Sequence, residues 1–117
     1  MKGGSMIIAC KREDIRWSKT PFIGVEFCWL SEKNENGRTA ILKFDEHAEL
    51  PLHNHPGWEQ IYVIEGRLKI NSEIYEKNDF AFIEEQTEHS ILALESSKYI
   101  TISQMEGVNM IAESLIS

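Results

Sequence analysis

The stretch LPLHNHPGWEQIYVIEG, residues 50–66, joins a polar pattern to an apolar one. His53 and His55 are two residues apart, and Glu59 follows four residues after the second histidine. From Glu59 onward, apolar and polar residues alternate until Gly66 ends the run. Alternation with a period of two is typical of a β-strand with one buried face. The stretch therefore predicts a strand that carries ionisable side chains on its buried face.

Strand geometry predicts which of these side chains lie together. Residues two apart on an extended chain point to the same face, so His53 and His55 should project together. Beyond the turn that follows them, Glu59 shares a face with Ile61 and Val63. A buried polar group without a partner costs roughly 2–7 kcal/mol, and a divalent metal would satisfy all three groups together. The alternative is a polar turn whose side chains hydrogen-bond locally.

Outside this stretch, short apolar runs alternate with turn residues, which is the pattern of an all-β chain. Asn36-Gly37 is typical of a hairpin turn. No segment before residue 108 has the sustained period of a helix, and residues 108–117 are compatible with either a last strand or one helical turn. A closed barrel or jelly roll would leave few exposed strand edges. We expect about eight strands, at residues 22–30, 39–45, 59–65, 67–70, 73–75, 80–83, 89–95 and 99–105.

Composition excludes several classes of protein. The 117 residues are 42% hydrophobic and 26% charged, which is typical of one soluble globular domain. The net charge of −7, without a cluster of Lys and Arg, disfavours nucleic-acid binding. No apolar run reaches the ~20 residues that span a membrane, so we expect a cytoplasmic protein. Cys10 and Cys28 form no metal-binding pair, and we expect two reduced core residues.

The central stretch resembles the first sequence motif of the cupin superfamily. That motif is His-x-His, three residues, Glu, six residues and Gly, and it matches His53, His55, Glu59 and Gly66. It usually opens with a glycine six residues before the first histidine, where this chain has His47. We expect His47 to be a structural loop residue.

The second cupin motif is degenerate in this chain. Its glycine, proline, glycine, histidine and asparagine positions hold Asn78, Glu84, Gln86, His89 and Ala93, respectively. Only the histidine is kept, and the family's fourth metal ligand comes from that position. The resemblance covers about residues 39–94 and implies one domain over residues 1–117. The implied fold is a double-stranded β-helix, the jelly-roll barrel of cupins.

The resemblance implies a metal site formed by His53, His55, Glu59 and His89, with one divalent transition metal per chain. Three imidazoles and a carboxylate, without thiolate, suit Fe, Mn, Ni, Co or Zn and disfavour Cu(I). The sequence does not choose among these metals. A glutamate of the acidic loop 84–88 is a candidate partner for the second nitrogen of His89. The simpler interpretation of that loop is solvated charge.

A substrate pocket is expected beside the metal, with walls formed by Trp58, Ile61, Val63 and Ile91. For Trp58, the alternative is a residue that merely covers the barrel mouth. These walls are apolar, which favours a small hydrophobic or aromatic ligand over a sugar. We also expect a homodimer, with Tyr62, Ile64 and residues 22–30 as contacts.

Three functions follow from the resemblance. The chain resembles small dioxygenases of the acetylacetone-cleaving kind, which implies an Fe(II)- or Mn(II)-dependent oxidoreductase acting on a small enolisable carbonyl compound. It also resembles the cupin domain of zinc-binding anti-sigma factors, which implies a non-catalytic zinc-binding sensor. The third possibility is a metal-dependent isomerase or a sugar-binding cupin. We expect a small-molecule ligand or substrate, and a stand-alone sensor would act through a protein partner.

Overall fold

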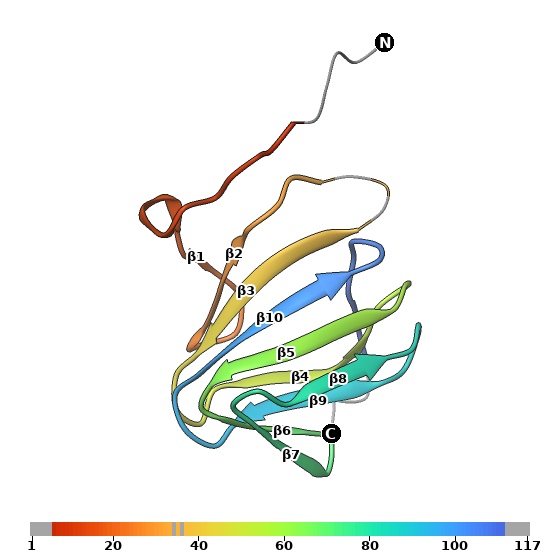
Figure 1. Ribbon diagram of the computed structural model, residues 1–117. Helices are drawn as coiled ribbons and strands as arrows, with labels where there is room; N and C mark the ends of the chain where they lie inside the picture. Colours follow the sequence, from red (N-terminus) through yellow and green to blue (C-terminus); the bar gives the residue numbers. More distant parts are fainter. Residues whose placement is uncertain (1–5, 34, 36, 112–117) are drawn as a thin grey trace.

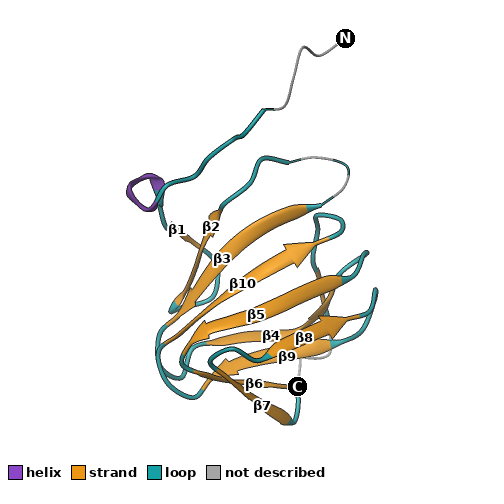
Figure 2. Ribbon diagram, viewed as in Figure 1, coloured by secondary structure: helices purple, strands orange, loops and turns teal. Residues whose placement is uncertain are grey.

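The computed structural model describes residues 6–33, 35 and 37–111, and these residues form an almost purely β structure (Figures 1 and 2). A single 3-10 turn, η1 (Arg12–Asp14), precedes the strands of the described part. The strands are β1 (Ser18–Lys19), β2 (Val25–Trp29), β3 (Arg38–Phe44), β4 (Glu49–Asn54), β5 (Glu59–Glu65), β6 (Arg67–Ile70), β7 (Glu73–Glu76), β8 (Phe80–Ile83), β9 (His89–Ala93), β10 (Ser97–Ser103) and β11 (Asn109–Met110).

The strands form two antiparallel sheets. One sheet has the order β1-β2-β3-β10-β5-β8 and the other has the order β11-β4-β9-β6-β7. The chain crosses repeatedly from one sheet to the other (Figure 1), which makes the double-stranded β-helix that the cupin resemblance implies. All expected strands are present. The short β1 was not expected, β11 realises the last strand that residues 108–117 left open, and β4 was recognised only at its histidine end.

The alternation in β5 places its residues as predicted. Glu59, Ile61 and Val63 are buried between the sheets, whereas Tyr62 is exposed on the outer face. The hydrophobic core that surrounds them is built from both sheets. Its buried members are Val25, Phe44, Ala48, Ile61, Val63, Leu68, Ile70, Ala81, Ile91, Ala93 and Tyr99.

Gly66 is where the chain passes from β5 in one sheet to β6 in the other. Its φ is +92°, and a Cβ at this position would overlap the hydroxyl of Ser97 and the carbonyl of Ser96. Only glycine fits such a close backbone approach with a positive φ. The glycine that ends the central motif therefore makes the sheet-to-sheet crossing possible.

Three positions where cupin motifs carry glycine hold other residues in this chain. His47, Asn78 and Gln86 nevertheless have φ values of 72°, 75° and 61°. This left-handed conformation is the one that favours glycine. The side chains differ from the motif, yet the backbone at all three positions adopts a conformation that glycine favours. His47 is an exposed turn residue, as expected.

Some expectations are only partly met. Cys28 is buried as predicted, but Cys10 is exposed, because the segment before η1 runs away from the barrel (Figure 1). Strands β2 and β3 pair as the hairpin signal predicts, although Asn36 itself lies outside the described residues. Within residues 108–117, Asn109–Met110 form a strand, and positions 112–117 lie outside the described residues. No helix in the described ranges is long and apolar enough to cross a membrane.

Candidate metal centre

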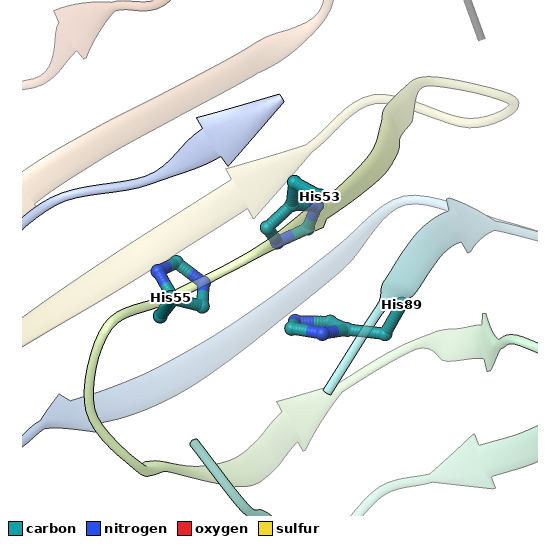
Figure 3. Close-up of side chains that lie close together, drawn as sticks. All are labelled: His53, His55 and His89. Atoms are coloured by element: carbon teal, nitrogen blue, oxygen red, sulfur yellow. The ribbon is translucent and has the colours of Figure 1, made fainter. Parts of the chain in front are cut away.

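Three histidines meet at one end of the barrel. His53 lies on β4, His89 begins β9, and the two residues are paired directly across these strands. His55 follows just after β4 ends. One ring nitrogen from each residue falls within 4.8 Å of the others, and Figure 3 shows the three rings gathered around a common centre. The structure therefore brings together the three histidines that the motifs single out.

His53 and His89 are oriented by their own chain segments. The Nδ1 of His53 lies 2.7 Å from the carbonyl of Pro51, and the Nδ1 of His89 lies 2.9 Å from the carbonyl of Thr87. A carbonyl oxygen only accepts, so each Nδ1 carries the hydrogen. Each Nε2 is then left with a free lone pair. The partner of His89 is thus a backbone carbonyl, and the exposed glutamates of loop 84–88 are not needed for that role.

His55 is oriented differently. Its Nδ1 donates to the carbonyl of Gly107, 2.9 Å away and 52 residues later in the chain. Gly107 lies in the connection between β10 and β11. The result is the same tautomer, with the Nε2 lone pair facing the centre. A hydrogen-bonded second nitrogen of this kind is typical of metal-binding histidines.

Glu59, at the start of β5, lies beside two of these histidines. Its Oε1 lies 3.3 Å from the Nε2 atoms of both His55 and His89. Its Oε2 accepts a hydrogen bond of 2.5 Å from the hydroxyl of Thr101. Burial acts to raise the pKa of Glu59, but the two imidazoles and the hydroxyl outweigh it and hold that pKa below its usual value. Glu59 is therefore a carboxylate at neutral pH.

The atoms that face the centre lack hydrogen-bond partners. Among the described residues, the buried side-chain atoms without such a partner include the Nε2 atoms of His53, His55 and His89 and the Oε1 of Glu59. Leaving one such atom unsatisfied costs about 1–3 kcal/mol. A cation between the three imidazoles would satisfy their nitrogens together, and the Oε1 of Glu59 lies beside two of them. Three imidazoles and one carboxylate form a suitable donor set for a divalent transition metal.

The protonation of two of these histidines differs. Burial lowers the pKa of His53 to about 4, so this ring is neutral at pH 7. Burial also acts to lower the pKa of His55, but the adjoining Glu59 carboxylate and the Gly107 carbonyl raise it by more, and the net shift is upward from 6.5. Because a metal binds only the neutral ring, it competes with a proton more at His55 than at His53.

A cavity of about 290 Å³ inside the barrel reaches the site at His55 and Glu59. It is predominantly apolar, and the phenol of Tyr99 stays protonated there because burial raises its pKa. The walls come mainly from β2, β3, β10 and the connection before β11. Its lining side chains include Phe22, Val25, Phe27, Trp29, Ala40, Leu42, Leu50, Tyr99, Met105 and Val108.

None of the four side chains expected to form the pocket lines this cavity. Ile61, Val63 and Ile91 are fully buried in the core, which side chains of both sheets build. Trp58 packs on the ring of Phe82, 5.9 Å between centroids, away from the cavity. The signal that could have located the walls is the alternation of apolar side chains along residues 22–30.

Comparisons with known proteins agree with this architecture. A family described as the ChrR Cupin-like domain matches residues 5–106. No curated protein sequence matches the chain. Among solved structures, the polyketide cyclase RemF from Streptomyces resistomycificus aligns with a TM-score of 0.80 at 14% identity, covering 91% of this chain and 86% of that one.

Two further structures represent different activities on the same fold. An acetylacetone dioxygenase from Acinetobacter johnsonii aligns with a TM-score of 0.77 at 12% identity, covering 95% of this chain and 80% of that one. The Rhodobacter sphaeroides SigE complex with the anti-sigma ChrR aligns with a TM-score of 0.69 at 22% identity, covering 80% of this chain but 50% of that one. At these identities, the likeness is one of fold.

Proposed function

This chain belongs to the ChrR cupin-like family, and on that basis we propose that it is a metal-binding cupin acting on a small, largely apolar molecule. One observation carries the proposal: the apolar cavity ends at His55 and Glu59, two of the groups that face the candidate metal centre. A molecule in this cavity would therefore reach the metal directly.

We propose that His53, His55, His89 and Glu59 hold one divalent metal. Support comes from the histidine nitrogens, which lie within 4.8 Å of one another, and from the unpartnered Oε1 of Glu59, 3.3 Å from two of them. When bound, such a metal supplies a Lewis acid and a template for oxygen-bearing substrates. The protein contributes the fixed tautomers of the three imidazoles and the charge of Glu59, which Thr101 holds in place.

The activity that we favour is that of an Fe(II)- or Mn(II)-dependent dioxygenase of a small enolisable carbonyl compound. The cavity walls support this proposal, because Phe27, Trp29 and Leu42 would exclude water from a reactive, uncharged substrate. An apolar wall offers no partners for the many hydroxyls of a sugar, which argues against a sugar-binding or isomerase cupin. The acetylacetone dioxygenase similarity shows that this fold accommodates such chemistry in another protein.

The test combines metal analysis with oxygen uptake on acetylacetone. We expect one iron or manganese per chain and oxygen consumption that depends on the substrate. A Leu42→Trp variant should fill the cavity and abolish uptake while the metal content stays unchanged. Ile41→Trp is the matched control, because its neighbouring position does not line the cavity. Equal uptake by both variants would contradict the proposed substrate site.

The second candidate is a non-catalytic, zinc-binding sensor, favoured by the match to the ChrR cupin-like domain. Four protein ligands complete a tetrahedral zinc site and leave no position for a substrate. Stoichiometric zinc that resists exchange, with no oxygen uptake after reconstitution with iron or manganese, would establish this alternative over the enzyme.

We also propose that residues 1–117 form a single cupin domain that pairs as a homodimer. Support comes from the outer face of the larger sheet, where Tyr62, Phe80, Phe82 and Ile102 are 42%, 53%, 54% and 38% exposed. Ile64 is half-buried and adjoins this face. Light scattering at micromolar concentration should give twice the chain mass, and a monomer would end the dimer proposal. A cytoplasmic location stays a prediction.

A further inference from the structure

The three histidines of the site differ in which part of the chain orients their rings. His53 and His89 bond to carbonyls two residues earlier in the chain, so forming their own segments is enough to orient them. His55 bonds to Gly107, which belongs to the loop of residues 104–108 between β10 and β11. The orientation of His55 therefore depends on whatever fixes this loop.

Arg38 and Glu106 form the contact that anchors the loop next to Gly107. The Nη1 of Arg38 donates to the Oε1 of Glu106 at 3.3 Å, and the Nζ of Lys33 lies 3.8 Å from the other oxygen. Arg38 is itself fixed, because its guanidinium lies 3.8 Å from the ring centre of Trp29 and its Nε donates to the carbonyl of Ser31. An anchored arginine of this kind loses little freedom on pairing.

The start of the loop is held separately. The backbone N–H of Gln104 donates to the carbonyl of Trp58 at 3.0 Å, and the N–H of Trp58 donates to the side-chain oxygen of Gln104 at 3.1 Å. These bonds fix residue 104 but leave the next residues to other contacts. The far end of the loop is held by Asn109, which pairs with Asn54 and donates to its side-chain oxygen at 3.0 Å. Between these two ends, Glu106 provides the side-chain anchor directly next to Gly107, whose φ of +118° is one that glycine adopts readily.

We propose that the Arg38–Glu106 ion pair is a positioning unit for His55. It holds the Gly107 carbonyl against Nδ1, fixes the hydrogen on that nitrogen and leaves Nε2 free to bind. Its effect on metal affinity rests on the proposed metal site, whereas its effect on the tautomer does not. Exposed ion pairs usually contribute little, but these side chains are only 20% and 33% exposed.

The test uses Glu106→Gln, which keeps the shape of the side chain and removes its charge. Long-range ¹H–¹⁵N spectra of the metal-free protein, at a pH above the pKa of His55, report the tautomer of each ring. We expect His55 to become a mixture of tautomers while His53 and His89 are unchanged. Zinc affinity, measured by competition with a chelator, should fall about fivefold, which is less than the ~10–100-fold typical of a direct partner of a ligand.

Glu26→Gln is the matched control. It breaks a 3.3 Å pair between Glu26 and Lys43 on the same sheet, away from loop 104–108, and should change neither quantity. Arg38→Lys, which keeps the charge but loses the planar fork, should show a smaller effect than Glu106→Gln.

Two results would overturn the proposal. The first is a Glu106→Gln protein with the same His55 tautomer as the wild type. The second is a change that spreads equally to His53 and His89, because this would indicate a general loss of structure. If the wild type binds no zinc, the proposed metal site fails, and the tautomer measurement still decides the role of the ion pair.

Discussion

The candidate metal centre consists of two regions that achieve the same ring geometry by different means. His53 and His89 lie on paired strands, are almost fully buried and are oriented by carbonyls two residues away. His55 lies just beyond its strand, is partly exposed and depends on a carbonyl 52 residues away. Local strand geometry thus organises one half of the site, and long-range closure of the barrel organises the other half.

Removing a strand-oriented ligand should have the largest effect. In His89→Ala, we expect metal affinity to fall by at least ~100-fold, because the loss of a ligand exceeds the ~10–100-fold cost of losing an outer partner. Elemental analysis after dialysis and chelator competition would measure the change. His47→Ala is the matched control, since His47 is exposed and outside the site. Stoichiometric metal in His89→Ala would exclude His89 as a ligand.

Glu59 contacts one histidine of each region. Removing the hydrogen bond that holds its carboxylate therefore tests both regions in one variant. Thr101→Val keeps the side-chain shape but removes the hydroxyl that donates to Glu59. We expect metal affinity to fall about tenfold and the unfolding free energy to fall by about 1–3 kcal/mol, because a buried carboxylate oxygen loses its donor. Chelator competition and urea unfolding measure these quantities. Thr101→Ser retains a hydroxyl and should keep most of the metal affinity and most of the unfolding free energy. If it does not, the loss in Thr101→Val comes from packing and not from the hydrogen bond.

In the metal-free protein, His53 and His55 should respond to pH in opposite directions. His53 has a folded pKa of about 4, below its ordinary value of 6.5, so its contribution to stability is present above pH 6.5 and is lost as the pH falls toward 4. His55 has a raised pKa, so its contribution is lost as the pH rises through the folded pKa. NMR titration of the ring protons should place the two midpoints on opposite sides of 6.5. A shared midpoint would contradict the difference in their surroundings.

The smallest effect should come from His47, which belongs to neither region. His47→Gly should raise the unfolding free energy by about 0.5 kcal/mol, since relief of ~1–2 kcal/mol of left-handed strain exceeds the ~0.5–1 kcal/mol entropic cost of glycine. Metal affinity should not change. Urea unfolding measures the gain, and a lower midpoint would show that the histidine side chain stabilises its turn.

The same division explains what could be predicted from the sequence. The spacing of His53, His55 and Glu59 is local, and strand alternation converts it into a shared face. His89 is distant in sequence, and only the family resemblance singled it out. Thr101 and Gly107 carry no recognisable signal, because they reach the site through pairing across the barrel.

The cavity shows most clearly what the sequence pattern does not predict. Alternation correctly predicted that Ile61 and Val63 face inward, but it carries no information about depth along the barrel. How closely the two sheets approach at each level decides whether an inward side chain becomes core or cavity wall.

The left-handed turns at His47, Asn78 and Gln86 have an energetic consequence. Compared letter by letter with the cupin motifs, the three positions count as three mismatches. Each residue nevertheless has a positive φ, a conformation in which glycine is less strained than a residue with a Cβ. The chain therefore stores backbone strain of roughly 1–2 kcal/mol at each of three separate turns, and a glycine at any of them would release it.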